Sequence, residues 1–314
     1  MLTKSSMRRL LPTALALFLA AVSLPAQESE ALPFTRIDRN PVTSAFAGAG
    51  SASMGNVAWS AFSNASVLPH FDGTLDAAVS FQRWAPALSG GTHWNAGVAY
   101  KVAPRLGLSL GYALQRGVEM DLMDEFGQQA GRFRPSDQVV AVGLAFGLGE
   151  EWSLGVNGRY AAQQLSESVR YAGFSGDVSV SFEPADDTRF SLGVASLGPR
   201  VKSQGGNAYR QPASVRAAAD WRLRFTDALS LDLLADADYF FSDNYGVSLG
   251  TELAWNRTAF LRAGYRYATP GCVLPGHVAL GAGVRFAGFH VDVCWLTASQ
   301  ALGNTLSAGL GFAF

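Results

Sequence analysis

The sequence has 314 residues, of which 48% are hydrophobic and 16% charged, and its formal net charge is −1. No basic stripe interleaves with aromatic residues, so nothing indicates a nucleic-acid partner, and two cysteines, Cys272 and Cys294, exclude a disulfide-rich scaffold. The 34 glycines and many apolar residues occur without a second apolar run of helical length. This combination is typical of a membrane protein built from strands.

The first 26 residues have the composition of an export signal. Lys4, Arg8 and Arg9 form a positive region, residues 10–24 form an apolar core, and small residues precede a cleavage site after Ala26. The core is shorter than the roughly 20 residues of a membrane-spanning helix. We therefore expect a signal peptide over 1–26 and a mature chain with 21 basic and 25 acidic residues.

Residues 27–72 come before the first predicted strand and include a run of small residues, "AFAGAGSASMGNVAW". A phosphate-binding loop would follow a buried strand and open a helix, and this run does neither. We interpret the segment as a periplasmic or plug segment, whose glycines let the backbone approach the barrel wall while aromatic residues are buried. The expected plug residues are Gly48, Gly50, Gly55, Trp59 and Asn64, with Phe46 and Phe62 as further aromatic contacts.

From residue 73 to the end, segments of about ten residues alternate apolar and polar side chains. In one of them Leu154 and Val156 alternate with Ser153 and Asn157, and a period of two indicates a strand. About fourteen such segments predict an all-β fold, a transmembrane antiparallel β-barrel over 73–314 with an apolar outer face. The predicted strands are 73–84, 91–103, 105–118, 134–148, 151–165, 173–183, 188–197, 212–225, 227–240, 244–256, 257–268, 276–286, 288–298 and 303–314.

Short and longer connections alternate between these strands. The short ones have two or three residues, as at 103–104 and 149–150, whereas 119–133 and 198–211 are long. Outer-membrane barrels have short periplasmic turns and longer external loops. The pattern therefore predicts a bacterial outer-membrane location with both chain ends facing the periplasm.

The inward positions of the later strands carry charges of both signs. Opposite charges on neighbouring strands pair across the ladder, so we expect a lumen charge network. Two readings stay open, a packed interior joined by ion pairs and a polar conduit for a solute. The residues of this network are Arg216, Arg222, Arg224, Asp232, Asp236, Asp238, Arg262, Arg266 and Asp292, with Glu252 and Arg285 nearby.

The final strand, "LSAGLGFAF", places Phe312 and Phe314 on its apolar face. A lipid-facing strand ends in this way at an aromatic girdle, and a terminal aromatic strand resembles the signal that barrel-assembly machinery reads. The expected partners are therefore outer-membrane lipid and that machinery.

Residues that could carry chemistry are sparse. The four histidines lack metal-ligand spacing, and no nucleophile elbow is present, so we expect no catalytic residues, metal or cofactor. His290 and Asp292, with His277 a strand away, could form an acid–base pair, although a hydrogen-bonded lumen histidine explains them as well. Cys272 and Cys294 are either bonded or free. The loops 119–133 and 198–211 are either solvated segments or docking surfaces for an exported protein.

Four segments in order, 124–160, 190–201, 250–267 and 288–314, resemble the PorV/PorQ family of outer-membrane barrels. The best match is "GTELAWNRTAFLRAGYRY", which is similar to the family's "G-x-E…L-R-x-G-Y" hairpin. The family's N-terminal "N-P-A" corresponds here to Asn64-Ala65-Ser66, without the proline. The family is related to the fourteen-stranded FadL-type barrels.

The resemblance implies a non-enzymatic role in type IX secretion or surface attachment, in which the barrel binds secreted cargo proteins or secretion-system components. The alternative is a FadL-like transporter that takes up small hydrophobic compounds through an N-terminal plug and a lateral opening. That alternative predicts an apolar pocket beneath the plug. A barrel enzyme would need clustered acids and histidines near the outer rim, and the sequence has none.

Overall fold

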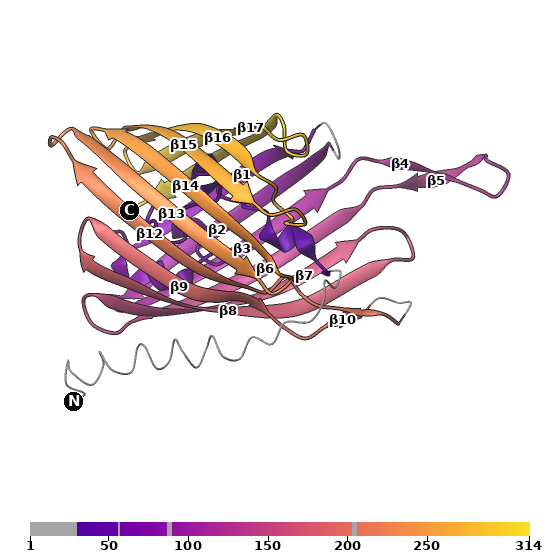
Figure 1. The fold of residues 1–314 in the computed structure, drawn as a ribbon, viewed down its shortest axis with the longest axis horizontal. Helices are drawn as coiled ribbons and strands as arrows, with labels where there is room; N and C mark the ends of the chain where they lie inside the picture. The colour runs from indigo at the N-terminus through magenta and orange to yellow at the C-terminus, as the bar shows by residue number, and fades with distance from the viewer. Residues whose placement is uncertain (1–29, 56, 87–89, 203–205) are drawn as a thin grey trace.

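The computed structural model describes residues 30–55, 57–86, 90–202 and 206–314. The expected signal peptide over 1–26 lies outside the described residues. Within them, fourteen strands form one closed antiparallel barrel (Figure 1), in the ring order β1-β18-β17-β16-β15-β14-β13-β12-β9-β8-β7-β6-β3-β2. The all-β barrel predicted from the alternating segments is therefore confirmed.

The strand bounds follow the predicted segments to within a few residues. The barrel strands are β1 (Leu75–Trp84), β2 (Gly91–Ala103), β3 (Leu106–Arg116), β6 (Ser136–Gly147), β7 (Trp152–Gln164), β8 (Arg170–Ala185), β9 (Thr188–Leu197), β12 (Ser214–Arg224), β13 (Leu229–Phe240), β14 (Asn244–Trp255), β15 (Ala259–Ala268), β16 (His277–Phe286), β17 (Phe289–Thr297) and β18 (Thr305–Ala313). Closure comes from the pairing of β1 with β18, from Asp76↔Ala313 to Arg83↔Leu306.

Two segments expected to be loops contain small hairpins of their own. Within 119–133, β4 (Met120–Met123) pairs with β5 (Gln129–Phe133), and within 198–211, β10 (Val201–Lys202) pairs with β11 (Ala208–Tyr209). These strands are short, and most of the β4 and β5 side chains are exposed. The alternation that identifies a half-buried strand is therefore too brief to detect in the sequence.

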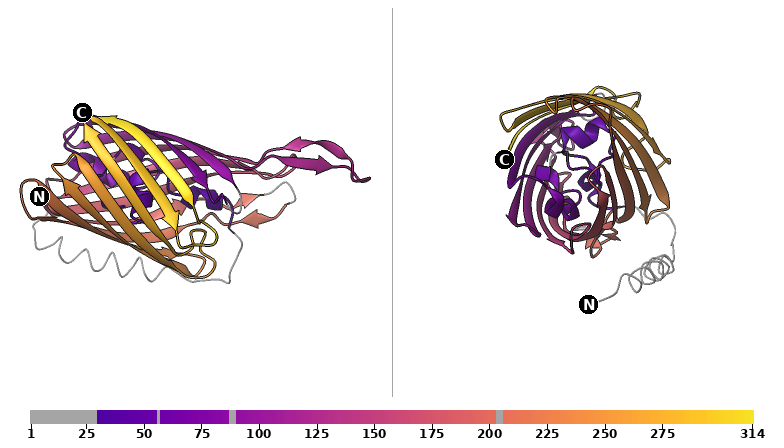
Figure 2. Two further views of the ribbon diagram at one scale, coloured as in Figure 1. Left: turned by 90° about the horizontal axis from the view of Figure 1, so that it is seen from above. Right: turned by 90° about the vertical axis from the view of Figure 1, so that its left-hand side faces the viewer.

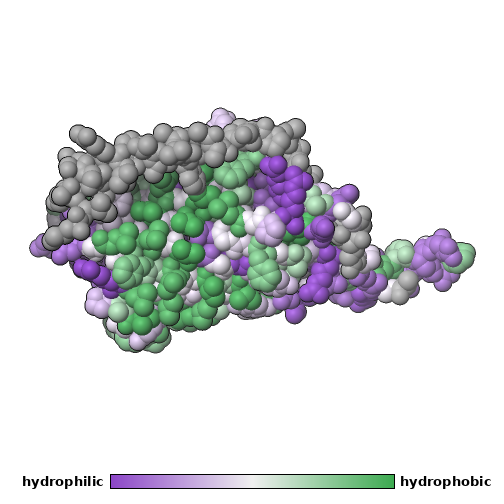
Figure 3. All heavy atoms as spheres, turned by 90° about the horizontal axis from the view of Figure 1, so that it is seen from below, coloured by the Kyte–Doolittle hydropathy of each residue, from purple (hydrophilic) through white to green (hydrophobic). Residues whose placement is uncertain are grey.

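The alternation of side chains sorts the wall into two faces. In β6, Val139 and Ala141 are buried whereas Val140 and Val142 are about half exposed. Apolar side chains gather over the outside of the barrel, with hydrophilic residues at both ends (Figure 3). An apolar outer band of this kind is what lipid requires, and the protein is accordingly an outer-membrane barrel.

The two ends of the barrel differ in their connections. We call the end with two- to four-residue turns the short-turn end and the other the long-loop end. The C-terminus lies at the short-turn end, and the β4–β5 hairpin projects from the long-loop end (Figures 1 and 2). Outer-membrane barrels have short periplasmic turns and longer external loops, so the short-turn end is the periplasmic end and the long-loop end is the external one.

The described residues from 30 to 72 lie inside the ring of strands, as the end-on view shows (Figure 2). Their short helices are η1 (Pro33–Arg36), α2 (Pro41–Ala45), η2 (Val57–Trp59) and η3 (Ala65–His70). None of the helices in the described part of the chain is long and apolar enough to cross a membrane. We call residues 30–72 the plug.

The first described residues of the plug lie at the long-loop end, and the chain end before them, expected to face the periplasm, lies outside the described residues. Glu30 forms a β-bridge with Arg210, and the amide of Ala31 donates to the Arg210 carbonyl at 2.8 Å, within the connection between β9 and β12. The plug then descends to Leu68, beside Gly107 at the short-turn end of β3. Because the segment threads the lumen, its first described residue and the C-terminus lie at opposite ends.

Candidate functional site: the plugged lumen and its pocket

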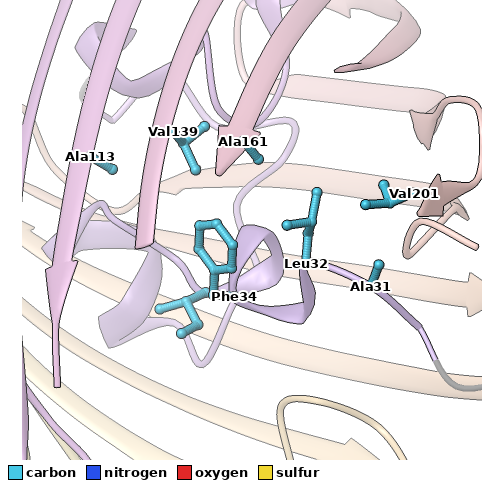
Figure 4. Close-up of a cluster of buried hydrophobic side chains, with 8 residues drawn as sticks. Ala31, Leu32, Phe34, Ala113, Val139, Ala161 and Val201 are labelled. Carbon is cyan, nitrogen blue, oxygen red and sulfur yellow. The ribbon is translucent and has the colours of Figure 1, made fainter. Parts of the chain in front are cut away.

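The upper part of the plug packs into the wall through an apolar cluster (Figure 4). Leu32 and Phe34 are buried against Ala113, Val139 and Val201. The cluster joins the plug to β3, β6 and the β10 strand of the long connection. It therefore closes the lumen between the plug and this part of the wall near the long-loop end.

An arginine–aspartate ladder lines the inner wall of β12–β15. Arg216 Nε donates to Asp238 at 2.6 Å, and Arg266 Nη1 reaches the other Asp238 oxygen at 3.3 Å. Arg222 pairs with Asp232 at 2.6 Å. The registers Arg216↔Asp238 and Arg222↔Asp232 produce these contacts directly.

A second group of charges centres on Arg262, whose side chain is fully buried. Its Nε lies 2.6 Å from Glu252 and its Nη1 lies 2.5 Å from Asp292. His290 lies between Asp292 and Asp76, at 3.2 and 3.3 Å. These groups neutralise one another across neighbouring strands, which is the condition for keeping buried charges stable.

The sequence leads us to expect Asp236 and Arg224 to pair with opposite charges on the neighbouring strand, and neither does so among the described residues. Asp236 lies opposite Ala218, not an arginine, and Arg224 lies opposite Ser230. The Asp236 carboxylate accepts hydrogen bonds from the backbone amides of Gly50 at 2.9 Å and Ser51 at 3.2 Å. It therefore binds the plug, whereas Arg224 is exposed at the short-turn end.

Other polar groups on the same side of the lumen also bind this turn of the plug. Ser248 donates to the Ala47 carbonyl at 2.9 Å and is held by Arg266 at 2.8 Å. Arg216 donates to the Ser51 hydroxyl at 3.1 Å. We call this set, formed by Arg216, Asp236, Arg266 and Ser248 with plug residues 47–51, the charged contact.

Residues 60–66 of the plug meet β7 and β8 through uncharged groups, whereas the amide of Ala58 donates to the Asp76 carboxylate of β1 at 3.0 Å. Asn157 of β7 donates to the carbonyls of Ser60 and Ala61 at 2.8 and 2.9 Å and accepts from the amide of Ala65 at 3.2 Å. Ser66 bonds Ser181 of β8 at 2.7 Å. We call these hydrogen bonds of plug residues 60–66 to neutral side chains of β7 and β8, together with the packing of residues 58–66 on glycines of β2, β3, β6 and β7, the neutral contact.

The predicted plug residue Asn64 organises the lower plug internally. Its amide donates to the Ser51 carbonyl at 2.7 Å, and its side-chain oxygen accepts from the Ser66 amide at 3.0 Å, which caps η3. Trp59, also predicted, is 2% exposed, as is Phe46. Asn64 thus links the charged-contact turn to the neutral contact through Ser51 and Ser66.

The glycines that allow close approach belong mainly to the wall, which changes the role predicted for Gly48, Gly50 and Gly55. Gly48 and Gly50 have φ of +91° and +148°, so their task is backbone conformation, and a Cβ at Gly55 would meet only its own segment. In contrast, a Cβ at Gly264 would lie 2.2 Å from the Phe46 carbonyl carbon. The wall glycines that lie against the plug in this way are Gly97, Gly107, Gly111, Gly155, Gly250, Gly264 and Gly281.

A pocket of about 320 Å³ opens above the plug at the long-loop end. Leu197, Ala213 and Phe241 supply apolar surface, and the polar and charged lining residues are Glu30, Ser196, Arg200, Arg210, Gln211 and Ser242. The FadL-like alternative predicted an apolar pocket beneath the plug. This pocket instead lies above it and has a mixed lining.

The barrel wall is irregular beside this pocket. The pairing of β8 with β9 shifts register between Gly176 and Val178, and its last pair at this end is Gly176↔Leu197. Beyond it, the Gln211 side chain donates to the Phe174 carbonyl of β8 at 2.6 Å, in place of a strand. A side-chain bond thus replaces the ladder where the pocket meets the wall.

The remaining candidates are the histidines and the cysteines. The acid–base candidate His290 does lie 3.2 Å from Asp292, whereas His277 donates to the Pro275 carbonyl at 2.8 Å. Cys272 and Cys294 are both free. Among residues 30–314, apart from the gaps given above, no group of three His, Cys, Asp or Glu side chains could hold a metal ion.

Comparison with solved structures finds the same fold in outer-membrane transporters. The monoaromatic hydrocarbon channel CymD matches with a TM-score of 0.64 and 12% identity over 91% of this chain and 99% of that one. The Pseudomonas putida toluene transporter TodX matches at 0.60 with 13% identity, and the Ralstonia pickettii toluene transporter TbuX at 0.58 with 12%, each over 87% of this chain and 97% of that one. No protein-family model and no curated sequence matches the chain.

The likeness shows the fold of the FadL-like outer-membrane barrels, and it does not extend to the PorV/PorQ family specifically. The matched structures are named as transporters and channels.

Proposed function

We propose that the protein is an outer-membrane channel for small hydrophobic compounds. The observation that carries the proposal is the position of the 320 Å³ pocket at the long-loop end, between Glu30 at the start of the plug and Leu197, the last β9 residue paired with β8 beyond the register shift. A compound in this pocket has two barriers to pass. One is the plug below the pocket, and the other is the wall beside it, where the Gln211 side chain bonds β8 in place of a strand. The matched channels CymD and TodX carry monoaromatic hydrocarbons or toluene, which supports the same substrate class.

The chemistry of the lumen favours a hydrophobic substrate over a polar conduit. Inward charged side chains form ion pairs or bind the plug. Arg262 pairs with Glu252 and Asp292, and Asp236 accepts a hydrogen bond from the Gly50 amide of the plug. Wall glycines bring the plug backbone into contact with the strands. A wide aqueous channel would need these charges to face water. The pocket has the size of small-ligand sites, roughly 300–1,000 Å³.

The pocket's lining narrows the substrate class. Phe241 and Leu197 offer apolar surface for a ring or short chain, while Ser242 and Ser196 offer hydroxyl groups at the same site. We infer compounds of one-ring size, either hydrocarbons or their monohydroxylated derivatives.

Uptake by cells with an intact outer membrane tests this function. Cells that carry the protein should accumulate a labelled monoaromatic compound several times faster than cells that lack it. Ser242→Trp places a large ring in the pocket and should remove most of that difference. Ser168→Trp, in an exposed loop at the same end, is the matched control and should transport normally. Equal uptake by the two variants would contradict the route through the pocket.

The β4–β5 hairpin favours a second candidate, the handling of exported proteins. It extends well beyond the barrel (Figure 1), and its Met123 and Phe126 are 62% and 79% exposed. Large apolar side chains on a projecting arm suit contact with another protein. The role in type IX secretion or surface attachment stays a prediction, and a pull-down from native membranes with the wild type and Phe126→Ser checks it. Loss of a secretion-system protein in the variant alone would support it.

A further inference from the structure

Two arginines lie on the lipid-facing side of the wall, at the long-loop ends of β1 and β3. Arg83 and Arg116 are both exposed, while the neighbouring inward residues Gln82 and His93 are buried. Both arginines are opposite the same residue of β2, since Arg83 pairs with Thr92 and Thr92 pairs with Arg116. Two strand spacings separate them, about 10 Å, which is a distance that two arginine side chains can bridge around one anion.

The cluster borders the aromatic edge of the apolar band. One outward position nearer the membrane centre, Phe81 pairs with Trp94, and their ring centroids are 4.7 Å apart. Trp94 is 57% exposed. Aromatic side chains in such girdles lie at the level of the lipid headgroups. Arg83, Thr92 and Arg116 therefore lie where headgroup phosphates are found.

Neither arginine is neutralised by a described neighbour. Their other cross-strand partners are uncharged, Leu306 beside Arg83 and Ser136 beside Arg116. No ion pair joins either guanidinium to a residue in 30–55, 57–86, 90–202 or 206–314. By comparison, Arg132 of the β4–β5 hairpin has Asp121 at 3.4 Å.

We propose that Arg83, Thr92 and Arg116 form a binding site for the phosphate of a lipid headgroup in the leaflet at the long-loop end. Guanidinium groups bind phosphate oxygens through paired, charge-assisted hydrogen bonds, and the Thr92 hydroxyl can donate one more. The Phe81–Trp94 pair contacts the glycerol region or upper acyl chain of the same lipid. Because the site lies on the outer wall, it is separate from the transport pocket and independent of the transported compound.

Lipid binding to the purified protein in detergent micelles tests the site, with native mass spectrometry counting the bound lipids. The probes are dioleoyl phosphatidic acid and the phosphate-free dioleoylglycerol. The test variant is Arg83→Gln with Arg116→Gln. The control is Arg257→Gln, which removes an exposed arginine at the short-turn end. Heat-modifiable migration on a denaturing gel establishes that each variant retains the folded barrel.

The wild type and Arg257→Gln should bind phosphatidic acid and leave dioleoylglycerol unbound. The double variant should bind phosphatidic acid about tenfold more weakly or worse, the effect of losing at least one charge-assisted bond. Arg83→Lys with Arg116→Lys, which keeps the charge and loses the bidentate geometry, should fall between them. Undiminished binding by the double variant, or equal binding of dioleoylglycerol, would overturn the proposal. Competition by equimolar inorganic phosphate would also overturn it, because it would identify a site for a free ion.

Discussion

The charged contact and the neutral contact hold the same plug through different chemistry. In the charged contact, Asp236 and Arg216 bind the turn at Gly50 and Ser51. In the neutral contact, Asn157 alone bonds three backbone groups between Ser60 and Ala65. Removing part of a buried charge network leaves other charges uncompensated, whereas removing a neutral side chain costs only its own hydrogen bonds. The two contacts should therefore respond differently to substitution.

The largest loss of stability is expected on replacing Arg262, the buried arginine of β15 that pairs with Glu252 and Asp292. Arg262→Met keeps the size of the side chain and leaves Glu252 and Asp292 without their shared partner. The free energy of unfolding should fall by about 3–5 kcal/mol, measured by denaturant unfolding in detergent. Arg132→Met is the control, since both side chains of its pair with Asp121 are more than half exposed, and an exposed pair contributes only about 0–1 kcal/mol. Equal losses in the two variants would contradict a buried network.

Replacing a wall glycine by alanine should lower the free energy of unfolding by a similar amount at the charged contact and at the neutral contact. Gly264→Ala forces a Cβ against the Phe46 backbone, and Gly97→Ala forces one to 2.4 Å from the Ala58 carbonyl oxygen. Each should cost about 1–3 kcal/mol through overpacking and should increase protease cleavage of the plug. Gly158→Ala is the matched strand control, because its Cβ would have 3.6 Å to its nearest neighbour. If Gly264→Ala leaves the free energy of unfolding and the protease cleavage unchanged, the plug does not lie against the wall at this position.

A moderate effect is expected in the neutral contact. Asn157→Ala removes three hydrogen bonds to the plug and leaves buried backbone groups of residues 60–65 unpaired. The expected loss is about 2 kcal/mol, read from denaturant unfolding, with faster hydrogen exchange at the Ala65 amide. The Gly50 amide, bonded to Asp236, should keep its protection. Loss of protection at both amides would show that the plug detaches as one unit and that the two contacts are not separable.

The smallest effect on stability is expected outside the lumen. Phe126→Ser, at the tip of the β4–β5 hairpin, should change the free energy of unfolding by less than about 0.5 kcal/mol, because the ring is 79% exposed. Thermal unfolding in detergent measures this directly. A large loss would mean that the ring packs against the barrel or another copy of the chain.

The alternation of side chains made the barrel predictable, since each strand needs one apolar and one polar face. The same alternation placed Arg216 and Arg222 on an inner face toward the aspartates of the next strand, and the observed registers are Arg216↔Asp238 and Arg222↔Asp232. It failed for Asp236, whose partners are plug amides, because contacts between the plug and the wall have no sequence period. The wall glycines were missed for a related reason. A small residue at an inward position has no hydropathy signal, although Gly250 and Gly264 do fall on the predicted inner face.

The most direct test of transport compares two solutes in cells that have an intact outer membrane and either carry or lack the protein. One is a labelled monoaromatic hydrocarbon and the other a labelled sugar of similar mass. The filled lumen and the pocket above the plug lead us to expect faster entry of the hydrocarbon and unchanged entry of the sugar. Faster entry of the sugar, or no change for the hydrocarbon, would contradict a plugged channel for hydrophobic compounds.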